Sequence, residues 1–303
     1  MKLNMKLQTP VADEKCKVGI SYNDKIMMVG SCFSDNIGKQ LKDLGFDVCV
    51  NPFGTLYNPA SIADAIRRLI SGVQFTAEDC TEIGAGSHKT CSFSHHTSFA
   101  RKSAEEFIEN ANKALAEAAD FFSRCNKVII TLGTSWCYRH IGTDRIVSNC
   151  LKHPAAEFAR EFLPSDQTSA LLEDIIKTCQ ESAASKPGFT EKEFIFTVSP
   201  IRHFKDGAHG NQLSKAALLL GVDSTIRNHS DKADYFPAYE IVMDELRDYR
   251  FYAEDMCHPT LQTANYIRER FLDWALPAEE HTKLEECIRA FKHSCHRSSH
   301  ATL

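Results

Sequence analysis

Two short segments near opposite ends of the chain carry the residue types of an acyl-transfer site. The first is Gly30-Ser31-Cys32-Phe33-Ser34, which follows an apolar run and precedes a segment with helical spacing. A nucleophile at such a turn stands at the end of a strand, where backbone N–H groups of the next helix can stabilise a developing oxyanion. The alternative is an ordinary small-residue turn, in which Ser31 caps the helix and Cys32 fills space in the core.

The second segment is Asp255-Met256-Cys257-His258, followed directly by Pro259. A carboxylate three residues before a histidine can lie on the same side of one turn. There it orients the imidazole and stabilises the imidazolium that forms when the ring accepts a proton. The segment therefore predicts an oriented base, and the alternative is a surface turn that Asp255 merely caps.

Two further turns could bind substrate. Gly133 and Ser135 follow an apolar run at 127–132, and Gly54 lies in the proline-flanked loop 51–59. The glycines allow a close approach of the backbone, and the Ser135 hydroxyl could contact a substrate oxygen. Each segment alone is equally typical of an ordinary turn.

Several histidines and basic residues are weaker candidates. His95 could line a substrate cleft, or it could be a polar loop residue. A basic cluster after the fourth expected strand could bind a carboxylate or a sugar, or could be solvated; it comprises Arg202, His203, Lys205 and His209.

Apolar runs alternate with helical spacing along most of the chain. We expect strands at 25–30, 46–51, 127–133, 193–199 and 238–244, and helices at 34–44, 60–69, 103–124, 168–185, 213–220 and 261–276. The stretch 71–100 is expected to form a long irregular excursion with room for a hairpin. Such alternation predicts a parallel sheet covered by helices on both faces, with ligands at the carboxyl ends of the strands.

Composition excludes several classes of protein. The net charge of -5 gives no reason to expect a nucleic-acid or anionic-membrane partner, and no apolar stretch is long enough to span a bilayer. The twelve cysteines include no CxxC pair, which argues against a zinc or thioredoxin-like site. With no signal-peptide pattern at the start, we expect a cytoplasmic protein with free thiols.

Together, and in this order, the motifs resemble the SGNH (GDSL-type) hydrolase superfamily and, more closely, the GSCFA family within it. The resemblance covers about residues 20–275 and leaves 276–303 as a charged helical tail. It implies a three-layer α/β/α sandwich with a mainly parallel, flavodoxin-like sheet. The matching segments are GSCFS (30–34), NPFGTLYNP (51–59), LGTSW (132–136), NCLKHP (149–154), FTVSPIRHFKDG (196–207), NQLSKAAL (211–218) and YFPAYEIVMDELRDYRFYAEDMCHP (235–259).

The resemblance also implies roles for single residues. Aligning GSCFS with the GDSLS of the superfamily puts Cys32 at the nucleophilic serine, which favours Cys32, with Ser31 as the alternative. Asp255 and His258 match the terminal DxxH, and Gly54 matches the glycine that donates to the oxyanion. The asparagine of the superfamily is absent from LGTSW. An oxyanion contact is therefore expected from Ser135, which stands in its place, or from Asn149.

The function implied is hydrolysis of an ester or transfer of its acyl group. The substrate would be a small metabolite or a glycan, as for an O-acetylesterase, and neither a metal nor an organic cofactor is needed. The alternative is a non-catalytic ligand- or glycan-binding module that keeps the fold, which the missing asparagine favours.

Overall fold

A sheet of five parallel strands lies at the centre of the protein. The structure is a computed structural model, which describes residues 9–11 and 15–300 and the side chains through residue 293. Along the sheet the order is β2-β1-β5-β9-β10. Chain order therefore reverses between β1 and β5, and ligands of such sheets bind at that switch point, beyond the carboxyl ends of the strands. The strands are β1 (Lys25–Gly30), β2 (Asp47–Val50), β5 (Lys127–Leu132), β9 (Glu193–Val198) and β10 (Ala233–Tyr235).

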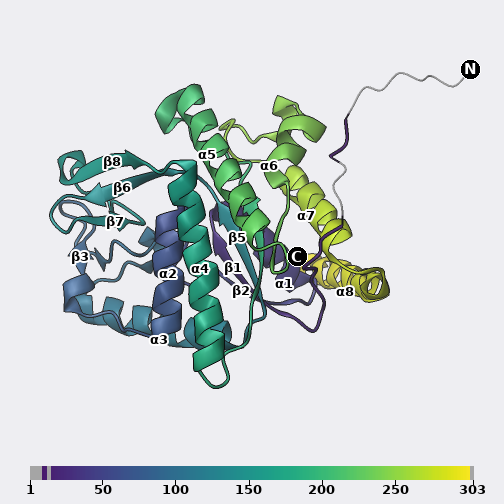
Figure 1. The fold of residues 1–303 in the computed structure, drawn as a ribbon, viewed down its shortest axis with the longest axis horizontal. Helices are drawn as coiled ribbons and strands as arrows, with labels where there is room; N and C mark the ends of the chain where they lie inside the picture. The colour runs from purple at the N-terminus through teal and green to yellow at the C-terminus, as the bar shows by residue number, and fades with distance from the viewer. Residues whose placement is uncertain (1–8, 12–14, 301–303) are drawn as a thin grey trace, which may run out of the picture.

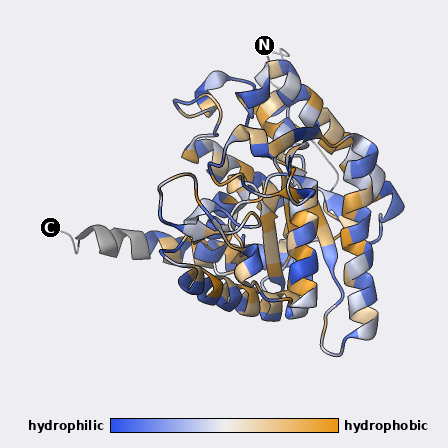
Figure 2. Ribbon diagram, turned by 90° about the vertical axis from the view of Figure 1, so that its left-hand side faces the viewer, coloured by the Kyte–Doolittle hydropathy of each residue, from blue (hydrophilic) through white to orange (hydrophobic). Residues whose placement is uncertain are grey.

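Helices cover both faces of this sheet (Figure 1). One face carries α1 (Cys32–Asp43), α7 (Leu261–Ala275) and α8 (His281–His300), and the other carries α2 (Pro59–Ser71), α3 (Ala104–Arg124), α4 (Ser165–Ser185) and α5 (Gly207–Asn228). Along β1, Ile26 and Met28 pack under the first set of helices, while Met27 and Val29 pack under the second. Apolar residues accordingly dominate the central strands, and hydrophilic residues face outward on the helices (Figure 2). The predicted three-layer α/β/α sandwich is confirmed.

Smaller elements extend from the sandwich. A hairpin of β3 (Thr81–Glu82) and β4 (Thr90–Cys91) lies in the expected excursion, and a separate antiparallel sheet has the order β7-β6-β8. That sheet, which the sequence analysis did not predict, comprises β6 (Trp136–His140), β7 (Arg145–Val147) and β8 (Phe158–Phe162). Short 3-10 helices are η1 (Ala77–Asp79), η2 (Thr97–Phe99), η3 (Ala155–Glu157), η4 (Phe204–Asp206), η6 (Tyr249–Phe251) and η7 (Ala278–Glu280).

The strand predicted at 238–244 is wrong. This segment is helical, with α6 (Ala238–Glu240) running into the π-helical η5 (Ile241–Leu246). Its buried residues Ala238, Ile241, Val242 and Glu245 recur at helical spacing, and the carboxylate of Glu245 pairs with Arg270 on α7. The fifth strand is instead β10, just before this segment.

The described residues include no helix that is both long and apolar enough to cross a membrane. The eleven cysteines from Cys16 to Cys287, all of which the structure describes with their side chains, are unpaired.

Candidate active site

The turn after β1 depends on Gly30. Its φ is 152°, and a Cβ atom at this position would lie 2.2 Å from the carbonyl oxygen of Thr131 on β5. Only glycine therefore allows the two strand ends to approach this closely. The N–H of Ser31 donates to the same carbonyl, at 3.2 Å. The start of α1 is thereby anchored at the switch point.

Ser31 and Cys32 differ in where their side chains lie. Ser31 is the N-cap of α1 and is fully buried, and its hydroxyl accepts from the N–H of Phe33 at 3.3 Å. Cys32, the first residue of the helix, is half-buried and lines a cavity of about 410 Å³. Of the two candidate nucleophiles, the cysteine is thus the one that borders this cavity.

His258 lines the same cavity as Cys32, although the two residues come from opposite ends of the chain. Tyr57, Thr134 and Asn149 contribute to the same walls. The cavity therefore lies beyond the carboxyl ends of β1 and β5, where an α/β sheet of this order binds ligands.

The turn from Asp255 to His258 is closed by its own hydrogen bonds. Asp255 Oδ2 lies 2.5 Å from Nδ1 of His258, and Oδ1 accepts the N–H groups of Cys257 and His258, each at 2.9 Å. The two backbone N–H groups and the imidazole lower the pKa of Asp255 to about 2. With the charged carboxylate on Nδ1, Nε2 of the neutral ring is left to accept a proton.

The segment after β9 holds this turn in place. The backbone N–H of Arg202 donates to the carbonyl of Cys257 at 3.1 Å, and its guanidinium donates to the carbonyl of Met256, also at 3.1 Å. Arg202 therefore ties the turn to the carboxyl edge of the sheet.

The thiol of Cys32 is not a preformed thiolate. Burial raises its pKa, and the nearby Asp35 adds to the effect. The N–H groups of Cys32 and Phe33 at the start of α1 oppose it only in part. A base is accordingly needed to deprotonate this sulfur at neutral pH.

Of the two side chains predicted to contact the oxyanion, Asn149 lines the cavity and Ser135 does not. Asn149 Oδ1 accepts from the N–H of Leu151 at 2.8 Å. Ser135 is fully buried outside the cavity walls, its N–H donating to Ser214 Oγ at 2.8 Å, while the adjacent Thr134 and Trp136 line the cavity.

Neither Gly54, the predicted oxyanion donor, nor Gly133, predicted to allow a close approach of the backbone, has a free N–H. The N–H of Gly54 donates to the carbonyl of Asn51 at 2.8 Å, and a Cβ on Gly54 would lie 2.3 Å from Cβ of His96. The N–H of Gly133 donates to the carbonyl of Tyr57, again at 2.8 Å. In this conformation neither N–H is available to an oxyanion, because both are engaged by backbone carbonyls.

The predicted role of His95 in a substrate cleft is wrong. His95 is fully buried, and its ring contacts Phe53, Phe75, Phe99 and Phe107. Its Nδ1 pairs with Ser92 Oγ at 2.7 Å, and burial lowers its pKa to about 3. The ring is therefore a neutral core residue, because its aromatic surroundings exclude water.

Comparison with known proteins agrees with the motifs. The sequence model of the GSCFA family matches residues 25–271. The chain belongs to the GSCFA family. Among curated proteins none matches this sequence. Among solved structures, this protein is similar to a mutant of Axe2, an acetyl-xylooligosaccharide esterase from a Geobacillus species. The two sequences are 10% identical, the TM-score is 0.42, and the match covers 86% of this chain and 96% of the Axe2 chain.

Two supporting residues of this GSCFA chain were missed by the sequence analysis. Asn51 accepts from the N–H of Gly30 at 2.8 Å and donates to Asp35 at 2.6 Å, linking β1, α1 and the loop after β2. Lys215 on α5 is buried and donates to the carbonyls of Gly133 (2.6 Å) and Ser199 (2.7 Å), and burial lowers its pKa to about 7. Both lie within matched family segments, which was the only signal available.

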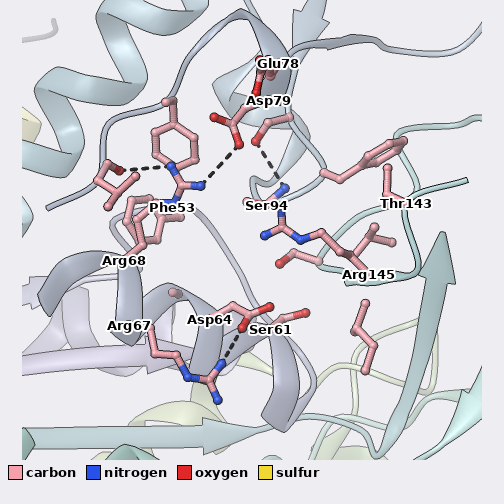
Figure 3. A pocket seen from close by; sticks show the side chains of 18 of the residues that line it. Phe53, Ser61, Asp64, Arg67, Arg68, Glu78, Asp79, Ser94, Thr143 and Arg145 are labelled. Carbon is pink, nitrogen blue, oxygen red and sulfur yellow. Dashed lines mark hydrogen bonds and ion pairs between the residues drawn. The ribbon is translucent and has the colours of Figure 1, made fainter. Parts of the chain in front are cut away.

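A second cavity of this GSCFA protein, of about 360 Å³, is lined by residues that include Phe53, Arg68 and Arg145 (Figure 3). It adjoins the first cavity at Val147 and Ser148, which line both. Its charged side chains are largely paired with one another. Arg68 lies 3.3 Å from Asp79, and Arg67 lies 2.6 Å from Asp64. None of the predicted site residues lines this cavity, so the candidate active site is the one that contains Cys32 and His258.

Proposed function

We propose that this GSCFA protein is a thiol-dependent ester hydrolase or acyltransferase. Cys32 is the nucleophile, His258 is the general base and acid, and Asp255 orients His258. The observation that carries the proposal is that Cys32 and the Asp255-paired His258 line one cavity. The substrate is an acyl ester of a small metabolite or a glycan.

The reaction begins with a protonated thiol. His258 Nε2 removes the proton of Cys32 as the sulfur attacks the acyl carbon, and Asp255 stabilises the imidazolium. The tetrahedral intermediate then collapses: the carbon–oxygen bond to the alcohol breaks, and His258 returns the proton to the leaving oxygen. Water, or a second alcohol in a transferase, releases the acyl group from the thioester.

Two features support stabilisation of the oxyanion. Cys32 is the first residue of α1, so its N–H points towards the helix start, where negative charge is favoured, whereas the N–H of Phe33 already donates to Ser31 Oγ. Asn149 offers a side-chain amide within the same cavity. We assign the oxyanion contacts to these groups, in place of Gly54 and Ser135.

Hydrolysis of p-nitrophenyl acetate and butyrate tests the proposal. We expect Cys32→Ala and His258→Ala each to lower kcat/KM by at least about 10³-fold, and Ser31→Ala to stay within a few-fold of wild type. Cys80→Ala, which removes a free cysteine that does not line the cavity, is the matched control. Activity that survives both Cys32→Ala and His258→Ala would refute the mechanism.

The non-catalytic binding module remains a competing function, favoured by the serine at position 135. It predicts no turnover of any ester by wild type. It also predicts that an acetylated sugar binds equally well to wild type and Cys32→Ala, which calorimetry would measure.

A further inference from the structure

The cavity beside His258 carries more positive than negative charge. Three cationic side chains line it, Arg160, Arg202 and Lys205, against one carboxylate, Asp206. The whole chain has a net charge of -5. The excess of positive charge is therefore local to this site and does not reflect a basic protein.

The single carboxylate is already paired. Asp206 forms an ion pair with Arg160, whose guanidinium also lies 4.8 Å from the ring centre of Tyr138. The Asp206 side chain is largely buried in this pair. Asp206 therefore neutralises Arg160 and leaves the other two cations of the cavity without a counter-charge.

Lys205 and Arg202 have no ion-pair partner among the residues that the structure describes. Lys205 Nζ lies 4.9 Å from the ring centre of Tyr138 on β6, so the side chain reaches across the cavity wall. Arg202 stacks on Phe204 at 4.2 Å and uses one N–H on the Met256 carbonyl. A guanidinium has five N–H donors, so others remain for a ligand.

The chemistry of the proposed function decides which part of the substrate meets these cations. His258 returns its proton to the leaving oxygen, so the alcohol portion of the ester must occupy the cavity on the side of His258. That cavity is the one lined by Lys205 and Arg202. A neutral alcohol would leave both charges unmatched in a concave site, where charge of one sign concentrates counter-ions.

We propose that the alcohol released by this site is an anion, with a carboxylate or phosphate that Lys205 and Arg202 bind. The inference rests on the proposed function for the placement of the leaving group. The reaction itself is unchanged: the sulfur–carbon bond forms, the carbon–oxygen bond breaks, and the proton from His258 goes to the departing oxygen. The substrate class is thus an acyl ester of an anionic alcohol, such as an acidic sugar or a phosphorylated metabolite.

A matched pair of acetate esters tests the proposal with the full-length protein. We expect kcat/KM for 4-acetoxybenzoate to exceed that for the neutral 4-acetoxybenzamide by about ten-fold or more at low salt, and the ratio to fall as salt is added. Lys205→Gln should reduce this ratio towards one, whereas Lys113→Gln, on the exposed face of α3, should keep it. 4-Acetoxyphenyl phosphate identifies the anion, since a higher kcat/KM than for the carboxylate indicates a phosphate-bearing substrate.

Binding of the product alcohols separates this inference from the proposed function. If wild type hydrolyses none of the esters but binds 4-hydroxybenzoate more tightly than 4-hydroxybenzamide, and loses that preference in Lys205→Gln, the anion site stands and the esterase proposal fails. Equal binding and equal turnover of the charged and neutral compounds would overturn the inference. A preference that is unchanged in Lys205→Gln would overturn it as well.

Discussion

Asp255 holds His258 through three contacts made within four residues. Its Oδ2 lies 2.5 Å from Nδ1 of the ring, and its Oδ1 accepts the backbone N–H groups of Cys257 and His258. The carboxylate therefore orients both the ring and the backbone that carries it. Arg202, anchored after β9, then fixes this unit against the sheet.

Asp255→Asn should lower kcat/KM by about 10²-fold or more, because the neutral amide does not stabilise the imidazolium, and an NH₂ group that donates to Nδ1 leaves the ring proton on Nε2, the nitrogen that must accept one. Ester hydrolysis measured at several pH values from 5 to 9 checks this expectation. Asp244→Asn, which changes an exposed carboxylate on η5, serves as the control. A loss that is equal in both variants would argue against a specific role for Asp255.

Ser31→Ala and Cys32→Ala should separate stability from activity. Ser31 is the N-cap of α1, so its loss should lower the free energy of unfolding by about 1 kcal/mol and leave kcat/KM near wild type. Cys32→Ala should abolish activity while changing stability little. Urea unfolding and ester hydrolysis on the same preparations measure both quantities. The reverse pattern would make Ser31 the nucleophile.

Asn149→Ala should reduce kcat by about 10- to 10³-fold, because it removes the side-chain amide assigned to the oxyanion. Ser135→Ala is the comparison, since its hydroxyl is buried and has no hydrogen-bond partner among the described residues. It should leave kcat close to wild type. Steady-state kinetics on one ester decides the matter, and a larger loss in Ser135→Ala would restore the role expected from its place in LGTSW.

Lys215 should give the protein a pH-dependent stability. Its pKa falls from 10.5 in the unfolded chain to about 7 in the fold, so the unfolded state binds the extra proton between these values. The contribution of Lys215 to the free energy of unfolding is therefore complete above pH 10.5. It decreases as the pH falls below that value and is lost once the pH has fallen through 7. We expect the free energy of unfolding to rise by up to roughly 1.4 kcal/mol per pH unit within this window.

Urea unfolding at pH 7, 8 and 9 measures that slope. Lys215→Met should lack the rise and should be less stable at pH 9, because it leaves the carbonyls of Gly133 and Ser199 without their donor. The exposed substitution Lys113→Gln should keep the wild-type slope. If Lys215→Met has the same slope as wild type, Lys215 keeps its ordinary pKa in the fold.

Much of the fold was readable from local pattern. The strands at β1, β5 and β9 are continuous apolar runs, and the helices between them repeat apolar residues at helical spacing. Each pattern depends only on residues a few positions apart, so it can be recognised without knowledge of the rest of the chain. One exception, at 238–244, was an apolar run too short to separate strand from helix; in the structure it is helical, and Glu245 just after it pairs with Arg270.

The candidate site divides in the same way. Asp255 and His258 are three residues apart, so sequence alone determined that they could pair, and Gly30 marked the turn before Cys32. Only the tertiary structure decided that Cys32 borders the cavity while Ser31 is buried, that His95 belongs to an aromatic core, and that Asn149 lines the cavity while Ser135 does not. The reason is physical: hydrogen bonds within a turn depend on neighbouring residues, whereas burial depends on side chains that the fold brings together from distant parts of the chain.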